Sequence, residues 1–331
     1  MLWGFLRRQW FLLALLACLA LGFLFPRADA LLNPGNLTRT SLIVALFLLM
    51  GLTLPSESIR SGLADWRLHL YIQGFLFLLT PAYFLLTSLP LRGSLSPGLL
   101  AGILALSCLP TTIASCVVFT QLAGGNVAGT LFNAAASNIL GVFLSPLLLS
   151  VLLRGAGRLV QASQLPAVLR DLALQVLVPI AVGQLLRRKL RAGVERRRGA
   201  LAVLANILLL GVILFTFARS AGAPGFLEQL RGALSLFLYL AASHLALVAL
   251  AWFGARALRF SAANVISVLF AAPQKTLALG VPLLATFFAR SPEALGLVVL
   301  PVLFYHPWQL LVAGLLRSAI GSGLLTGSRR P

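Results

Sequence analysis

The sequence predicts an all-helical polytopic membrane protein with ten transmembrane helices, because its composition is apolar and its long apolar segments recur at regular intervals. Of the 331 residues, 60% are hydrophobic and only 10% are charged, whereas about 25% of the residues in an ordinary soluble domain are charged. Lipid is therefore the expected surrounding. The basic residues are scattered between the apolar segments, which indicates membrane topology and excludes nucleic acid as a partner.

Ten apolar stretches are long enough to cross about 30 Å of hydrocarbon at about 1.5 Å per residue. The first resembles a signal peptide, but its 17 apolar residues exceed a signal core, so we expect a first helix instead. The largest polar loop, Arg187 to Gly199, has no room for a domain, and residues 1–331 are expected to form one membrane domain. The predicted spans are 10–26, 37–55, 68–89, 97–122, 127–153, 168–187, 200–219, 231–254, 262–289 and 295–317.

The basic residues in the loops predict the orientation of the chain. If the N-terminus is cytoplasmic, that side receives 16 basic residues, including Arg7 and Arg8, and the opposite side receives nine. Both termini are therefore expected in the cytoplasm, and the protein in a plasma membrane, namely a bacterial inner membrane. Lys275 belongs to neither face.

Five spans precede the basic linker from Arg154 to Arg170 and five follow it. Because each half has an odd number of membrane spans, the second half is inserted in the opposite orientation to the first. This is the inverted-repeat plan of secondary transporters. We expect repeat one at about 10–153 and repeat two at about 168–317. Pro110 and Pro273 interrupt the fourth span of each half, and paired interruptions of this kind point to a transport site.

The first interruption is rich in hydroxyl groups. Pro110 removes a backbone donor and frees a carbonyl, and the side chains of Thr111, Thr112 and Ser115 can satisfy the backbone or bind an ion there. A proline kink in a structural helix, with the hydroxyls bonded back to their own backbone, is the alternative interpretation.

The second interruption, Pro273-Gln274-Lys275-Thr276, places a cation near the bilayer midplane, where a charge costs about 2.5–3.5 kcal/mol on insertion scales. Three roles are open for Lys275. It can attract an anion together with the positive N-termini of the half-helices. It can lose its proton and act as a proton carrier, or it can be a structural charge balanced by carbonyls exposed at the helix break.

Weaker candidates lie elsewhere on the spans. Asn133, Ser137 and Asn138 in the fifth span are spaced i, i+4 and i+5, so the first two share a helix face. Gln73 in the third span and His306 in the tenth are similar, and hydrogen bonds between helices alone can explain all of them. His306 is interpreted as an interior histidine or a proton relay.

Several motifs resemble the bile acid:sodium symporter family over essentially the whole chain. They are Met50-Gly51-Leu52-Thr53-Leu54-Pro55, Leu109-Pro110-Thr111-Thr112, Gly125-Asn126-Val127 and Ser145-Pro146-Leu147. Two more resemble the symporter-like subgroup that includes the seventh member of the bile-acid carrier family. They are Lys275-Thr276-Leu277-x-x-Gly280-Val281-Pro282 and Tyr305-His306-Pro307-x-Gln309.

The resemblance implies a panel of helices one, two, six and seven, a core of the others, and a crossing of the unwound fourth and ninth helices at the site. It implies cotransport of organic anions with sodium by alternating access. The residues that match the sodium sites are Thr112, Ser115, Asn133 and Gln274, with Thr276 and Gln73 nearby. However, no acid stands between Phe270 and Pro273, and the Lys275 charge would repel sodium, so sodium coupling is in doubt.

The leading hypothesis is a carrier of a small organic, anionic solute in the lipid bilayer, in which Lys275 and the half-helix ends hold the anion or substitute for the missing cation. A proton-coupled or exchange carrier using Lys275 and a solute-binding regulator that does not transport are the alternatives. No cofactor is expected, and the coupling ion is sodium or a proton. The sequence lacks a His-Glu-x-x-His motif, a Gly-x-Ser-x-Gly motif and an acid pair in the membrane, so an enzyme is not expected.

Overall fold

The computed structural model describes residues 10–54, 65–154, 165–223 and 225–321, and every regular element in these ranges is a helix. The first half contains α2 (Trp10–Leu24), α3 (Arg27–Leu32), η1 (Pro34–Asn36), α4 (Leu37–Thr53), α6 (Trp66–Gly74), η2 (Phe75–Leu79), α7 (Thr80–Thr87), η3 (Leu89–Gly93), α8 (Pro97–Ser107), α9 (Ala114–Ala123) and α10 (Val127–Arg154). The second half contains α11 (Leu165–Leu172), η5 (Ala173–Leu177), α12 (Val178–Arg196), α13 (Arg198–Ala221), α14 (Phe226–Gln229), α15 (Ala233–Ala257), α16 (Ala262–Ala271), α17 (Leu277–Phe287) and α18 (Pro292–Gly321).

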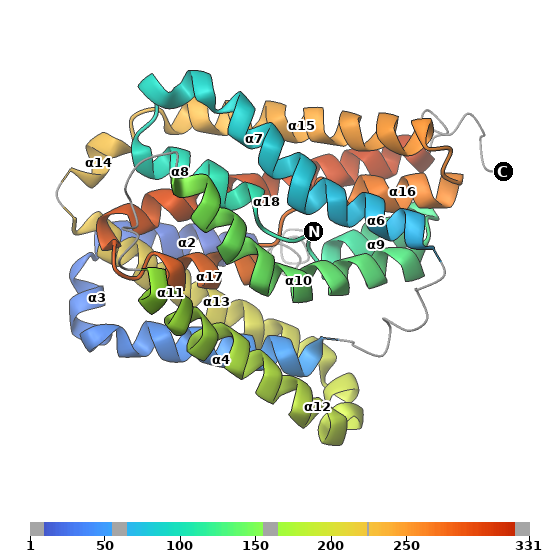
Figure 1. Ribbon diagram of the computed structural model, residues 1–331. Helices are drawn as coiled ribbons and strands as arrows, with labels where there is room; N and C mark the ends of the chain where they lie inside the picture. The colour runs from blue at the N-terminus through green and yellow to red at the C-terminus, as the bar shows by residue number, and fades with distance from the viewer. Residues whose placement is uncertain (1–9, 55–64, 155–164, 224, 322–331) are drawn as a thin grey trace, which may run out of the picture.

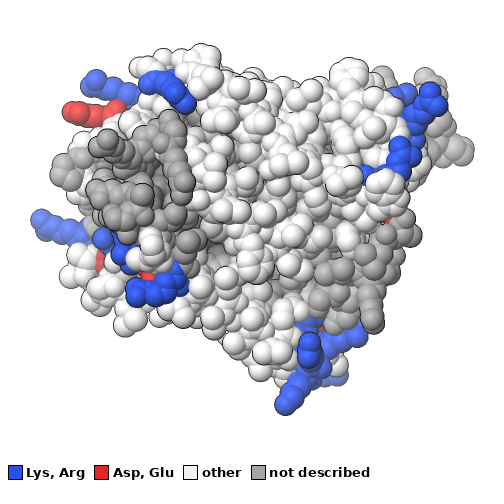
Figure 2. Space-filling view, viewed as in Figure 1, with Lys and Arg blue, Asp and Glu red and all other residues white. Residues whose placement is uncertain are grey.

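The helices confirm a polytopic membrane protein. Within the described ranges, seven helical segments are long and apolar enough to cross a bilayer, and α2, α8, α9, α16 and α17 are shorter apolar helices. Figure 2 shows Lys and Arg gathered toward the two ends of the molecule, with a broad belt between them that carries almost no charge. The predicted fourth and ninth spans are each divided into two short helices, α8 with α9 and α16 with α17.

One predicted loop is wrong. The basic stretch from Arg187 to Gly199 is helical almost throughout, because α12 continues to Arg196 and α13 begins at Arg198. Arginine, lysine and leucine are good helix formers, so the helix continues where the apolar pattern stops. Arg7, Arg8, Pro55 and much of the linker between the predicted repeats lie outside the described residues.

The helices pack in two groups. In one, α4 packs on α12 and α13 packs on α2 and α4; in the other, α8 and α15 pack on α18, and α16 packs on α10. In Figure 1, α4 and α12 lie along the lower edge and α7 and α15 along the upper edge, with the broken helices between them. The site described below lies where the two groups face each other.

Two glycines allow α4 and α12 to cross in backbone contact. A Cβ atom added to Gly51 would lie 2.3 Å from the carbonyl oxygen of Ile180, and one added to Gly183 would lie 2.3 Å from that of Leu48. Small residues permit such close approach between membrane helices, which associate through packing and hydrogen bonds. Gln184 adds a hydrogen bond of 2.6 Å from its side chain to the carbonyl of Gly51.

We expect Gly183→Val to destabilise the protein, because the new side chain overlaps the backbone of α4 and overpacking costs about 1–3 kcal/mol or more. The matched control is Gly193→Val in the same helix, where no atom lies within 4 Å of an added Cβ. Thermal unfolding of the two detergent-purified variants measures the difference. Equal melting temperatures would show that the crossing does not need glycine.

Candidate functional site

The two interruptions meet in space. The first runs from the end of α8 at Ser107 to the start of α9 at Ala114, and the second from the end of α16 at Ala271 to the start of α17 at Leu277. The backbone N–H of Thr276 donates a 2.8 Å hydrogen bond to the carbonyl of Pro110. The N–H of Thr276, in the second interruption, thus satisfies a carbonyl that has no helical donor in the first interruption.

Every carbonyl of the first interruption, from Ser107 to Thr112, accepts a hydrogen bond, and all but the last accept it from a residue at least 27 positions away. Pro110 bonds to Thr276, as above, and its neighbours accept side-chain donors from distant helices or the next turn. The donors, in order from residue 107 to residue 112, are Lys275 Nζ, Ser145 Oγ, Lys275 Nζ again, Thr276 N, Asn138 Nδ2 and Cys116 Sγ. The interruption is therefore a fixed structure and not a loose kink.

The Lys275 side chain is 1% exposed, and its ammonium is enclosed by backbone oxygens. Nζ donates to the carbonyls of Ser107 and Leu109 at 2.8 Å each and to that of Leu76 at 3.2 Å. Two of these acceptors lie at the C-terminal end of α8, where the helix dipole is negative. An ammonium has three donors, and all three are used.

The carbonyl of Leu76 is free because of a local π-helical turn that ends at a proline. In η2, hydrogen bonds run to the fifth residue along the chain, and the N–H of Thr80 bonds to Phe75. The next donor in this pattern would be residue 81, which is Pro81 and has no N–H. The carbonyl of Leu76 is therefore available to Lys275. Sequence reasoning missed it, although a proline inside the third span was the signal that could have found it.

Helix α18 holds the second interruption in place. The Gln309 side chain accepts a hydrogen bond from the N–H of Lys275 and donates one to the carbonyl of Lys275, both at 2.8 Å. The hydroxyl of Tyr305 donates to the carbonyl of Pro273 at 2.7 Å. His306 lies beside this clamp, with Nδ1 3.0 Å from Nε2 of Gln309.

Side-chain oxygens from the two interruptions form a small cluster. The hydroxyl of Thr112 donates to Oε1 of Gln274 at 3.0 Å, and the hydroxyl of Ser115 lies 2.6 Å from that of Thr112. These are three of the four residues that match sodium sites. All three are neutral, and no carboxylate of the described residues is hydrogen-bonded to them, so this set lacks the charged oxygen ligand that a hard cation favours.

The other predicted residues lie apart from this cluster. Asn133 bonds to Gln73, whose Nε2 lies 3.2 Å from the Asn133 side-chain oxygen, and to His69 at 2.9 Å. Ser137 bonds back to the carbonyl of Ala134 in its own helix, at 3.0 Å. Asn133 and Gln73 thus link α6 to α10, as hydrogen bonds between helices would.

A cavity of about 370 Å³ lies beside the crossing, between the two groups of helices. The first turns of both α9 and α17 face it, through Ala114 and Ala278 among others. Helix N-termini carry positive partial charge and unpaired N–H groups. No acidic residue is among the described residues that line it. Its polar lining residues are Thr53, Thr112, Ser115, Asn138, Asn206, Thr276 and His306.

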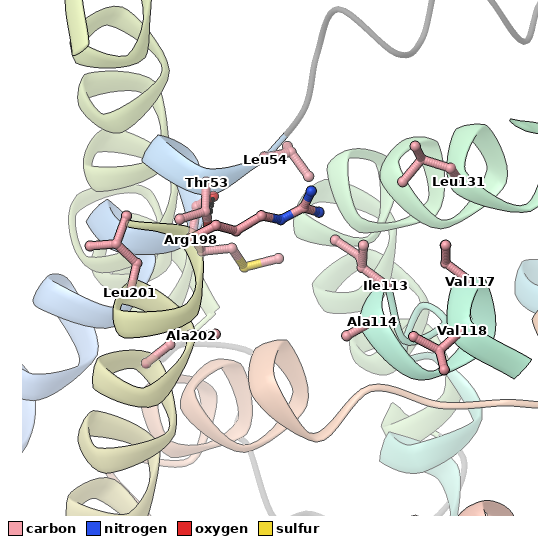
Figure 3. Close-up of a pocket in the computed structure, with 12 residues that line it drawn as sticks. Thr53, Leu54, Ile113, Ala114, Val117, Val118, Leu131, Arg198, Leu201 and Ala202 are labelled. Carbon is pink, nitrogen blue, oxygen red and sulfur yellow. Dashed lines mark hydrogen bonds between the residues drawn. The ribbon is translucent and has the colours of Figure 1, made fainter. Parts of the chain in front are cut away.

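A second cavity of about 410 Å³ shares lining residues with the first, including Met50, Thr53 and Ala114. Figure 3 shows Arg198 reaching from the start of α13 into the space between α4 and α9. Its guanidinium is the charged group among the described lining residues. The sequence pattern did not single out Arg198, because it is one of seven basic residues in a short stretch.

Comparison with known proteins identifies the relatives of this chain. The model of the SBF-like CPA transporter family matches residues 9–321. The chain is 30% identical over 320 residues to sodium/bile acid cotransporter 7 of Danio rerio, covering 95% of this chain and 94% of the relative. It is 36% identical over 275 residues to a protein of Pseudomonas aeruginosa, PA2026, covering 82% and 80% of the two chains. The resemblance predicted from the motifs is confirmed.

We expect Gln309→Leu to lower the free energy of unfolding, because it leaves the buried N–H and carbonyl of Lys275 without partners, at about 1–3 kcal/mol for each. Gln309→Glu in its neutral, protonated form keeps both an acceptor and an O–H donor, and should be less damaging. Thermal unfolding in detergent checks this order, with Gln121→Leu on the exposed face of α9 as the control. A Gln309→Leu melting temperature equal to that of the control would contradict the clamp.

Proposed function

The chain belongs to the SBF-like CPA transporter family, and from that premise we propose that it is a secondary active transporter that moves a small organic anion by alternating access. The observation that carries this proposal is the Lys275 ammonium, buried among carbonyls and adjacent in the chain to Thr276, which lines a cavity that two half-helix N-termini face. Broken helices whose ends point at a site between two helix groups are typical of secondary transporters.

For the architecture, we propose ten spans in two inverted repeats, with the helix pairs α8/α9 and α16/α17 each counted as one span. The packing supports this count. In these repeats α2 corresponds to α12, α4 to α13, α8 to α16 and α10 to α18. The contact of α4 with α12 then corresponds to that of α13 with α2, and the contact of α8 with α18 to that of α16 with α10. The panel is then α2, α4, α12 and α13. The end with Arg187 and Arg198 faces the cytoplasm of a bacterial inner membrane.

An anionic solute is supported by the charges around the cavities. The first turns of α9 and α17 present positive helix ends, and Arg198 supplies a full positive charge at the neighbouring cavity. The hydroxyl and amide groups of the wall, such as Asn206 and Thr276, can donate to a carboxylate or sulfonate. The apolar remainder, including Leu46 and Leu209, suits the carbon skeleton of an organic acid.

Of the three roles open for Lys275, its contacts favour substitution for a bound cation. All three donors of its ammonium are occupied by carbonyls, so none is available to hold a solute. Some relatives have names that describe them as cotransporters of sodium and bile acid. In this chain, a positive charge attached to the protein does the work of a cation held beside the anion, and we propose transport that does not depend on sodium.

Alternating access then consists of movement of the panel against the core. The cavities lie between these two groups, with Met50 and Ala205 on one side and Ala114 on the other. The Lys275 contacts join elements of the core alone, so the hydrogen bonds around its ammonium stay intact while the panel moves. The solute exchanges for a second anion or travels with a proton.

We expect wild-type uptake into proteoliposomes to change less than 2-fold when choline replaces sodium, and Lys275→Ala to lose at least about 10-fold in sodium-free medium. The variant leaves the carbonyls that Lys275 contacts buried and unpaired, next to an anion site. Sodium or another alkali cation that binds there should restore part of the rate. The solutes tested are organic anions, including a bile acid, that raise the melting temperature in a thermal-shift screen.

Lys189→Ala is the matched control, since the chain has two lysines and Lys189 is exposed on α12. A Lys275→Ala variant with unchanged rate and cation dependence would refute the proposed role. Wild-type uptake that rises with an inward proton gradient would instead support a proton carried by the site. A solute that binds but is not transported would leave a solute-binding regulator as the function.

We expect Ala278→Leu to reduce uptake at least about 10-fold with little change in melting temperature, because the added methyl groups fill the cavity at the first turn of α17 and do not disturb the core. Ala128→Leu, on the exposed face of α10, is the control of equal size. Uptake and thermal unfolding are measured on the same preparations. Normal uptake by Ala278→Leu would place the solute elsewhere.

A further inference from the structure

One end of the panel carries the basic residues around Arg187 and Arg198. A second concentration of positive charge lies at the other end, where α13 ends beside the start of α4. It contains Arg39, in the first turn of α4, and Arg219, in the last turn of α13. The turn that leads into α4 places Gly35 and Asn36 in the left-handed region, at φ 58° and 64°. This conformation directs the Asn36 side chain toward both arginines.

The two guanidinium groups share a single neutral acceptor. Nη2 of Arg39 donates to Oδ1 of Asn36 at 3.3 Å, and Nη1 of Arg219 donates to the same oxygen. The Arg39 side chain is only 2% exposed, and its Nη1 is buried without a hydrogen-bond partner. A buried charged donor without a partner is costly, so something other than Asn36 is needed there.

The local charges do not balance. Neither arginine forms an ion pair with a carboxylate of the described residues. The carboxylate of Asp29 accepts a 2.7 Å hydrogen bond from Asn33. The positive N-terminal end of α4 adds to the two guanidinium charges.

We propose that Arg39, Arg219 and Asn36 form an anion-binding site for a phosphate group. Guanidinium groups match the geometry of phosphate and bind it through pairs of parallel hydrogen bonds. A phosphate between the two arginines removes their repulsion and supplies the acceptor that Nη1 of Arg39 lacks. The amide of Asn36 holds the two side chains in place for it.

The position of the site gives the phosphate two sources. Arg39 is close to the start of the apolar segment Pro34–Thr53, at the depth where phospholipid headgroups meet the end of a membrane helix. The phosphate is therefore that of an anionic lipid or a free ion. Arg219 is ten residues beyond Leu209 of the central cavity, about 15 Å along α13, so this site is separate from the proposed transport site.

Thermal unfolding tests the site without any transport assay. One arm compares the detergent-purified protein in sodium phosphate and in sodium chloride of equal ionic strength. The other compares nanodiscs of phosphatidylglycerol with nanodiscs of phosphatidylcholine. We expect the wild-type melting temperature to rise by about 2–4 °C in at least one arm. A rise in the first arm identifies the free ion, and a rise in the second alone identifies the lipid.

Arg219→Gln is the decisive variant, because it leaves the buried Arg39 in place. Without phosphate or anionic lipid, the variant should melt no lower than about 2 °C below the wild type, because Arg39 no longer faces a second guanidinium. With phosphate or anionic lipid, its melting temperature should not rise. Arg231→Gln, an exposed arginine near the start of α15, should keep the rise. Absence of any rise in the wild type, or an equal rise in Arg219→Gln, would overturn the proposal.

Discussion

The structure depends on one constraint, which is that the buried ammonium of Lys275 must be surrounded by oxygen atoms although no carboxylate of the described residues pairs with it. Backbone carbonyls meet this need, and regular helices do not leave carbonyls free. The chain frees them at the end of α8 and at the π-helical turn before Pro81.

The two interruptions have complementary chemistry. The first presents a series of carbonyls, and the second presents donors to them, namely the Lys275 ammonium and the N–H of Thr276. Inverted repeats alone would make the two interruptions alike. The difference comes from side chains, with hydroxyls beside Pro110 and a cation beside Pro273, so the site has one electronegative and one electropositive half.

Much of this arrangement could be predicted from local sequence. Pro110 and Pro273 stand out because they interrupt corresponding spans of the two halves, and Lys275 stands out because charge is rare at membrane depth. The partners of Lys275 could not be predicted, since backbone carbonyls leave no mark on a sequence and Leu76 lies about 200 residues away. The grouping of Asn133 with Gln73, apart from Thr112, likewise depends on how α6 packs against α10. Helix periodicity says which residues share a face, but not which helix that face meets.

A tethered cation changes what the site can do. A bound sodium ion can enter and leave together with the solute, so its electrochemical gradient can drive the transport cycle of a carrier. The Lys275 ammonium cannot leave, so the carbonyls are satisfied whether or not a solute is present. If transport is independent of sodium, as we propose, the driving force must come from a counter-anion or from a proton gradient. The carbonyls that accept hydrogen bonds from Lys275 are therefore also the basis of the proposal that transport does not depend on sodium.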